Sequence, residues 1–303
     1  MNLKVILAKR DKLIKLTISL LILIFLFNFI DFKLFFDSIK NVNQLFLLAL
    51  LFVPLNILLR AYRWKIILNH YIKIVSIKDS FVLNLVGIAL NIFLPASFGD
   101  VAKSYYGYKW HGYKEEMLSS SILDKFLALF SVFIIGSLTS FLIGLYVYST
   151  LSIILSVLMG ITIFYPKIVP WSILNKITSY FIKQELNEKK LKFAFNVSNK
   201  IKIYSLSISL LAWLLLYLQF YLICLSFSIE ISFIYILAVS PLMNIALLFP
   251  FTINGLGTGE AMVTYLFSII NISPTLAVLV SLVSQIVNAI IPGIFGFFFI
   301  LRK

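Results

Sequence analysis

Long apolar runs separated by short polar connections dominate the sequence. A transmembrane helix needs roughly 20 apolar residues to cross a hydrocarbon layer about 30 Å thick. This pattern predicts an all-α polytopic membrane protein with about six full spans. The six runs lie at about Leu13–Ile30, Gln44–Leu59, Ser119–Val147, Leu151–Val169, Ile203–Phe227 and Pro274–Leu301.

Two further apolar runs, Phe81–Pro95 and Phe233–Phe249, end in interruptions. In each, a proline is followed two positions later by a hydroxyl residue, and then by glycine and an acid. In hydrocarbon, an interrupted backbone is tolerated only where protein or a water-filled cavity satisfies its polar groups. We therefore expect two re-entrant hairpins of broken helix, and eight full spans remain the alternative. The expected helix-breaking residues are Pro95, Gly99, Pro250 and, in the last span, Pro292.

The distribution of lysine decides the predicted topology. Cytoplasmic connections of membrane proteins carry an excess of lysine and arginine. The segment 167–202 is rich in lysine, and it would lie outside if Phe81–Pro95 crossed the membrane completely. A hairpin at this run places that segment and both termini in the cytoplasm. Residues from Trp171 onward then form either an interfacial helix or a plain cytoplasmic linker.

Corresponding features of the two halves recur roughly 140 to 165 residues apart, as inverted-topology repeats require. Pro95 and Pro250 are one such pair. We expect a single transmembrane domain over residues 1–303, built from repeats at about 1–148 and 149–303. Paired breaks of this kind indicate a transport site at the interface of the repeats.

The composition supports a function within the membrane. Hydrophobic residues make up 61% of the chain, charged residues 13%, and the mean hydropathy is +1.02. The length is taken up by membrane elements, which leaves no room for a soluble catalytic domain. The net charge of +14 comes from basic residues beside apolar runs, so it indicates topology and anionic lipid rather than nucleic acid.

Charged residues inside apolar helices are costly and are therefore candidates for function. Asp124 and Lys125 are adjacent, so they point about 100° apart on a helix and need separate partners. Asp100 and Lys103 close the first interruption, and Glu260 closes the second. The alternative is structural: these groups cap helix ends and pair with one another.

Two other groups could bind an anion. Arg60 and Arg63 share a helix face and could hold a phosphate together, although anchoring at the interface with Trp64 explains them equally well. Gly255 and Gly257 could offer backbone N–H groups at the start of a helix near Glu260. Glu260 could itself cap that helix, and the glycines could instead serve close packing. Neutral hydrogen bonds could come from Ser97, Thr252 and Asn254.

Motifs for soluble enzymes, nucleotides and metals are missing from the sequence. No nucleophile elbow or phosphate-binding loop occurs, so we expect no enzyme and no cofactor. His70 and His111 lie in polar connections without neighbours at metal-ligand spacing. The one cysteine, Cys224, lies in an apolar helix.

The sequence resembles the transmembrane region of lysylphosphatidylglycerol synthases, a family of flippase-like membrane proteins with stand-alone members. The landmarks cover nearly the whole chain. They are Arg60-Ala61-Tyr62-Arg63-Trp64, Asn91-Ile92-Phe93-Leu94-Pro95 with Gly99-Asp100 and Lys103, Gly255-Leu256-Gly257 ahead of Glu260, and Pro292-Gly293-Ile294-Phe295-Gly296. The resemblance implies handling of amphiphilic lipids with phosphate-bearing heads. The aminoacyl-transferring domain of the full synthases is missing, so lysylation of lipid is not expected.

The chain departs from the family at three positions. Gly259 and Gln285 stand where arginine is frequent in the family, and Lys125 also replaces a frequent arginine. Since lysine and glutamine lack the planar guanidinium fork, the resemblance implies altered headgroup contacts.

Together these observations predict a lipid translocase of the bacterial inner membrane. Its partner would be an anionic membrane lipid, held by the helix breaks together with Lys103 and Lys125. Asp124 and Glu260 would pair with the lysines or carry coupling protons. Two alternatives stay open: a secondary transporter of a small solute, and an accessory subunit of a membrane enzyme that synthesises lipid or glycan. Association into homo-oligomers is also possible.

Overall fold

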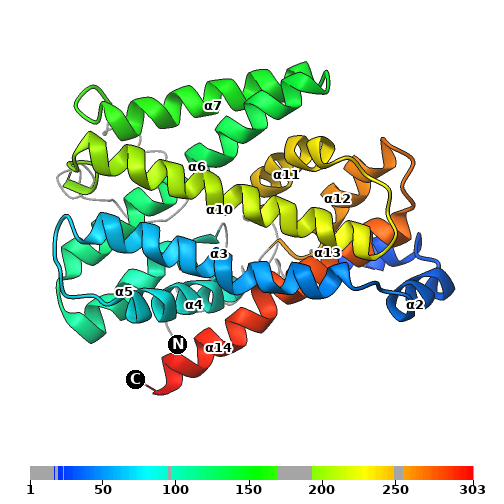
Figure 1. Cartoon of the computed structure of the whole chain (residues 1–303), viewed down its shortest axis with the longest axis horizontal. Coiled ribbons are helices and arrows are strands. Elements are labelled where there is room, and N and C mark those ends of the chain that lie inside the picture. Colours follow the sequence, from blue (N-terminus) through cyan, green and yellow to red (C-terminus); the bar gives the residue numbers. More distant parts are fainter. Residues whose placement is uncertain are drawn as a thin grey trace.

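The computed structural model describes residues 17, 20–22, 24–94, 97–169, 193–248 and 255–302, and within this part every regular element is a helix. The arrangement is shown in Figure 1. The elements are α2 (Phe32–Lys40), α3 (Leu45–Leu68), α4 (Ile77–Phe93), α5 (Gly99–His111), α6 (Lys114–Leu142), α7 (Tyr146–Phe164), α10 (Asn199–Ser226), α11 (Phe233–Leu248), α12 (Thr258–Ser268), α13 (Pro274–Gln285), a π-helix (Ile286–Ile290) and α14 (Ile291–Arg302).

Five of the predicted spans are present as helices long and apolar enough to cross a membrane. They are α3, α6, α7, α10 and the continuous helix Pro274–Arg302, which joins α13 to α14 through the π-helix. This confirms an all-α polytopic membrane protein. The span predicted at about Leu13–Ile30 is described only in part, and residues 170–192 of the lysine-rich segment lie outside the described residues.

The first interrupted run forms a helical hairpin. Helix α5 packs antiparallel on α4 (Figure 1), with Gly107 near Leu83 at one end and Gly99 near Asn91 at the other. The 17 residues of α4 span about 25 Å at 1.5 Å per residue, less than the hydrocarbon thickness. Gly99 opens α5 directly against α4, where a Cβ atom would overlap the carbonyl oxygen of Gly87. Gly99 therefore acts by permitting close packing. Pro95 lies outside the described residues.

Helices α11 and α12 pack on each other and form the second hairpin. Between them, Gly255 (φ 72°) and Gly257 (φ 89°) adopt left-handed backbone conformations that favour glycine. Pro250, Thr252 and Asn254 lie outside the described residues.

Pro292 does not break the last span, contrary to expectation. Proline has no N–H to donate, and its ring clashes with the carbonyl four residues earlier. The helix accommodates this by widening into the π-helix just before Pro292, where the N–H of Ile291 donates to the carbonyl of Ile286. Beyond it, α14 packs closely on α4 through Gly293 and Gly296, where no side chain keeps the backbones apart.

Several elements differ from the prediction. The span predicted at Ser119–Val147 is α6, which starts at Lys114 and stops at Leu142, because Gly144 (φ 79°) makes the turn into α7. Helix α7 accordingly lies about five residues before the span predicted at Leu151–Val169. Helix α3 continues through Arg60 and Trp64 to Leu68, so these side chains lie within the bundle rather than at its end. The loop after Ile30 contains the unpredicted α2, whose first turn is capped by the Asp31 carboxylate.

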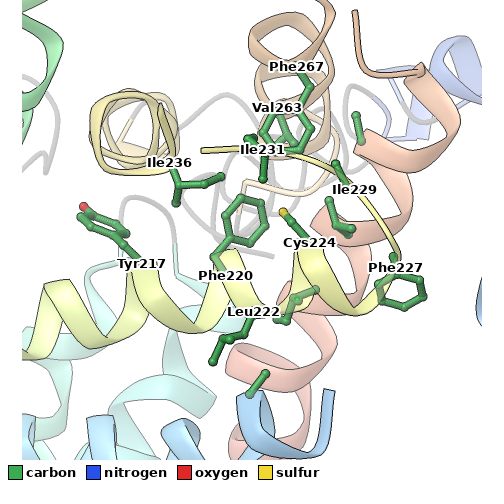
Figure 2. Close-up of a cluster of buried hydrophobic side chains, with 14 of the residues drawn as sticks. Tyr217, Phe220, Leu222, Cys224, Phe227, Ile229, Ile231, Ile236, Val263 and Phe267 are labelled. Atoms are coloured by element: carbon green, nitrogen blue, oxygen red, sulfur yellow. The ribbon is translucent and has the colours of Figure 1, made fainter. Parts of the chain in front are cut away.

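The two hairpins are held by different chemistry. An apolar cluster that includes Phe220 and Phe267 packs α12 against α10 and α13 (Figure 2). In lipid such contacts stabilise by close packing, since lipid tails are as apolar as the core. The first hairpin meets α3 and α6 through apolar contacts, such as those among Trp64, Leu83 and Met117, and also through charged side chains, described below.

Candidate functional site

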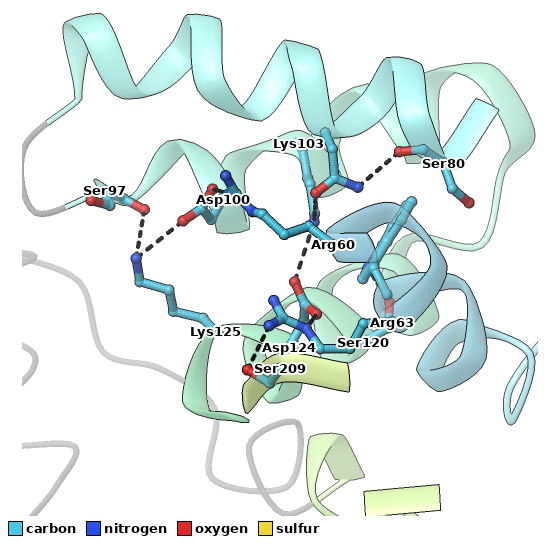
Figure 3. Close-up of polar contacts among 12 residues, drawn as sticks. Arg60, Arg63, Ser80, Ser97, Asp100, Lys103, Ser120, Asp124, Lys125 and Ser209 are labelled. Carbon is cyan, nitrogen blue, oxygen red and sulfur yellow. Dashed lines mark hydrogen bonds and ion pairs between the residues drawn. The ribbon is translucent and has the colours of Figure 1, made fainter. Parts of the chain in front are cut away.

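Three helices each contribute two charged side chains to one polar cluster, which we call the charge cluster (Figure 3). All six side chains were candidates from the sequence. The fold brings them together because α6 packs on both α3 and α5. Its members are Arg60 and Arg63 of α3, Asp100 and Lys103 of α5, and Asp124 and Lys125 of α6.

The outer group of the cluster centres on Asp100. Its Oδ1 lies 2.8 Å from Nη2 of Arg60, and its Oδ2 lies 3.1 Å from Nζ of Lys125. Asn91 of α4 also donates to Oδ1, at 3.2 Å. Lys125 makes a further hydrogen bond of 3.3 Å to the carbonyl oxygen of Ser97 in the hairpin turn. Asp100 therefore ties the tip of the first hairpin to both α3 and α6.

The inner group centres on Asp124, which is 3% exposed. Nε of Arg63 donates to Oδ1 at 2.6 Å, and Nζ of Lys103 lies 3.4 Å from Oδ2. Both basic groups make a further hydrogen bond: Arg63 Nη1 donates to Ser209 of α10, and Lys103 donates to Asn84. Burial of a charge is tolerated when it is paired and hydrogen-bonded in this way.

The ammonium group of Lys103 lies 4.7 Å from the ring centre of Trp64, in a cation–π contact. Lys103 itself is 1% exposed. Together with its two hydrogen bonds, this enclosure leaves Lys103 no surface for a ligand. The role of Lys103 as a headgroup contact stays a prediction, and the contacts described here are structural.

The cluster contains more positive than negative charge. Four basic side chains share two carboxylates, so its formal charge is +2. Asp100 and Asp124 do not neutralise the basic groups one for one. A positive excess inside a membrane protein favours an anionic ligand, because unpaired charge in a low dielectric is costly.

A cavity of about 160 Å³ lies against this cluster. One side is polar, and Arg60, Asp100 and Lys125 are the half-buried charged groups there. The other side is apolar and includes Trp213 and Leu216 of α10. A charged wall facing an apolar wall suits an amphiphile. Sequence candidates that line this cavity are Arg60, Arg63, Asn91, Ser97, Asp100, Asp124 and Lys125.

The pairing bears on two expectations. The alternative that the buried charges pair with one another is confirmed for Asp100 with Lys125 and for Asp124 with Lys103. Arg60 and Arg63 each bind a different carboxylate here, so their joint binding of a phosphate stays a prediction. Anchoring at the interface is wrong for Arg63 and Trp64, which are buried.

Glu260 lies apart from the charge cluster. It is fully buried in α12, where its Oε2 accepts from the Gly257 N–H at 2.6 Å and its Oε1 accepts from Gln285 Nε2 at 2.6 Å. No ion pair within the described residues involves it, so the expected pairing with a lysine is wrong. Glu260 caps its own helix and occupies the N–H of Gly257 that an external anion would use. The other predicted donor in this loop, Gly255, supplies carbonyl contacts to Thr258 and Gly259.

Two amides that the sequence analysis missed belong to the site. Asn56 of α3 lines the cavity and donates to the carbonyl oxygen of Ala212 at 2.6 Å. Asn244 of α11 lines it from the second hairpin. The signal was present in both cases, because a lone amide in an apolar run is costly unless it has partners.

Comparison with known proteins gives two matches. The family profile described as the lysylphosphatidylglycerol synthase TM region matches residues 12–296. A UPF0104 membrane protein from Methanocaldococcus jannaschii is 25% identical over 310 residues, and the alignment covers 94% of this chain and 92% of that protein. No solved structure shows a significant match.

Proposed function

Because this chain belongs to the lysylphosphatidylglycerol synthase transmembrane-region family, we propose that it binds an anionic, phosphate-bearing lipid and moves it across the membrane. The family points to a membrane role connected with lipid. Translocation and the phosphate-bearing headgroup are the steps added here. The proposal assigns no chemical reaction to the chain.

The excess positive charge beside the amphipathic cavity carries this proposal. Arg60 and Lys125 share one carboxylate and both line the cavity. A phosphate has enough acceptor oxygens to bind both cations, and charge-assisted hydrogen bonds of this kind are strong. The headgroup would compete with Asp100 for the two cations, while the acyl chains lie against apolar surface such as Trp213 and Leu216.

This competition suggests how movement of the lipid is coupled to the hairpin. Asp100 and the Ser97 carbonyl fix the hairpin tip to Lys125. A phosphate that takes over Lys125 and Arg60 releases those contacts, so binding favours a different position of the tip. In this proposal the two hairpins are the moving parts of inverted repeats, at about 1–148 and 149–303, in a bacterial inner membrane with both termini cytoplasmic.

The first test is lipid retention by the purified protein. Native mass spectrometry of wild type should show a phosphate-bearing lipid class retained beyond its share of the membrane. Lys125→Met should lower retention by about tenfold or more, the scale of one lost charge-assisted hydrogen bond. Lys109→Met removes an exposed lysine of α5 outside the charge cluster and should change nothing.

The second test measures movement. In proteoliposomes, wild type should expose fluorescent phosphatidylglycerol of the inner leaflet to an external quencher, and Lys125→Met should not. Retention of bulk lipid in native proportions, with no movement, contradicts the proposal. Transport of a soluble anion, or a stoichiometric membrane enzyme in the preparation, would then indicate the solute carrier or the accessory subunit.

A further inference from the structure

A second cavity, of about 210 Å³, lies next to the first, and Leu216 and Asn244 line both. It is formed by α10, α11, α13 and the π-helix. Whereas five charged side chains of the described residues line the first cavity, none lines the second. Its polar wall consists of Tyr217, Ser240, Asn244, Ser281, Ser284, Gln285 and Asn288.

The amide groups of this wall have a defined orientation. Nδ2 of Asn288 donates to the carbonyl oxygen of Ser284 at 3.1 Å, and Nδ2 of Asn244 donates to that of Ser240 at 2.9 Å. Nε2 of Gln285 donates to the Glu260 carboxylate. Because these partners can only accept, each NH₂ group must occupy the position assigned to it. The three amide oxygens make no hydrogen bond within the described part of the chain.

Two serine hydroxyls add to this set. Ser240 is 3% exposed, and its Oγ has no hydrogen-bond partner within the described residues. Ser281 is 6% exposed and makes no side-chain hydrogen bond there either. Buried polar groups are nearly always satisfied, so a set of unpartnered groups lining one cavity indicates a ligand or bound water.

The local backbone helps to shape this wall. The π-helix Ile286–Ile290, which accommodates Pro292, directly follows Gln285 and carries Asn288 and Ala289 to the cavity wall.

We propose that this second cavity binds an uncharged, hydroxyl-bearing extension of the lipid headgroup, such as a glyceryl or sugar group, while the phosphate occupies the first cavity. Three amide oxygens without a partner among the described residues call for a ligand that donates hydrogen bonds, and hydroxyl groups do so. An ammonium group also donates, but no carboxylate of the described residues lines this cavity to compensate its charge. The inference rests on the proposed function and specifies the substrate of the same site.

The test is a competition between two lipids with identical acyl chains. Phosphatidic acid carries the phosphate alone, and phosphatidylglycerol carries the phosphate with a glyceryl group. Wild type should retain phosphatidylglycerol about tenfold over phosphatidic acid, as expected for one or two added hydrogen bonds. It should retain lysylphosphatidylglycerol more weakly, because that headgroup brings an uncompensated ammonium group.

The variant for this test is Ser240→Ala with Ser281→Ala. Neither hydroxyl has a hydrogen-bond partner in the part of the chain that the structure describes, so the double variant should melt like wild type. It should reduce the preference for phosphatidylglycerol to about twofold or less, with phosphatidic acid unchanged. Ser121→Ala with Ser205→Ala is the matched control, because these buried serines are also unpartnered but line neither cavity.

The outcomes separate the two proposals. Equal retention of phosphatidylglycerol and phosphatidic acid by wild type, or strongest retention of the lysyl lipid, would overturn this inference and leave the proposed function standing. Retention of neither lipid above phosphatidylcholine would overturn the proposed function itself. An unchanged preference in the Ser240→Ala, Ser281→Ala protein would also overturn the inference.

Discussion

Asp124 and Lys125 are consecutive residues of α6, and their side chains enter two different ion-pair groups. Asp124 binds Arg63 and Lys103, whereas Lys125 binds Asp100. These two residues of α6 thus connect it to Arg63 of α3 and to both Asp100 and Lys103 of α5. The inner group holds the helices together, and the outer group offers its cations to the cavity. Substitutions in the outer group should therefore change lipid binding, and substitutions in the inner group should change stability.

Replacing Asp100 by asparagine should strengthen lipid binding. The carboxylate occupies Arg60 at 2.8 Å and Lys125 at 3.1 Å, so its removal frees both cations for a phosphate without changing the side-chain volume. We expect Asp100→Asn to raise retention of phosphate-bearing lipid several-fold, and to slow its release. Native mass spectrometry checks the first effect and proteoliposome kinetics the second. Loss of retention similar to that in Lys125→Met would show that Asp100 organises the site instead of competing with the ligand.

Lys103 should act on stability more than on lipid binding. Its ammonium group is enclosed by Asp124, Asn84 and the Trp64 ring. Removing one partner of a buried charge costs roughly 3 to 5 kcal/mol, and Arg63 still pairs with Asp124, so we expect the lower end of that range for Lys103→Met. Thermal melting in detergent should show a clear decrease, with no change in Lys109→Met. A variant with normal melting and no bound lipid would make Lys103 a headgroup contact after all.

The sequence predicted the helices and the first hairpin because their signals are local. Apolar length gave the spans, and the lysine bias required Phe81–Pro95 to return to its starting side. Partner choice is different, because it depends on which helix faces which. Nothing near Asp100 in the sequence shows that it meets Arg60 and Lys125 rather than Lys103, three residues away. The burial of Arg63 likewise depends on α10, which supplies Ser209.

Some errors came from local signals that were weighed wrongly. Pro292 reads as a break, but the helix absorbs it by widening into a π-helix. Glu260 reads as a partner for a lysine, yet its own helix start and Gln285 satisfy it. Each residue interrupts an apolar run, Pro292 as a helix breaker and Glu260 as a charge. The sequence identifies both positions, but their roles depend on the packing.

Exchanging Glu260 and Gln285 tests whether they form one hydrogen-bonded unit. Glu260→Gln alone lets Gln285 turn and accept from the new NH₂ group, so it replaces a charge-assisted hydrogen bond by a neutral one and should destabilise by about 1 kcal/mol. In the double variant Glu260→Gln, Gln285→Glu, the new amide can accept from Gly257 and donate to the new carboxylate. Melting of the double variant should therefore recover toward wild type. If the two losses simply add, the pair is not coupled in this way.

The last prediction concerns the sides of the membrane reached by the first hairpin. Cys224, the one cysteine of the chain, is buried, so an introduced cysteine supplies the accessible thiol. Two exposed residues report on the two arms of the hairpin. Lys73 lies between α3 and α4, before the first arm begins, and Tyr108 lies near the end of α5, the second arm. Because α5 runs antiparallel to α4, Lys73→Cys and Tyr108→Cys should both be protected from an impermeant thiol reagent in intact cells. Glu230→Cys, between α10 and α11, should react and serves as the positive control.

Reaction of Tyr108→Cys from outside, with Lys73→Cys protected, would mean that α4 crosses the membrane completely. The first hairpin would then not be re-entrant.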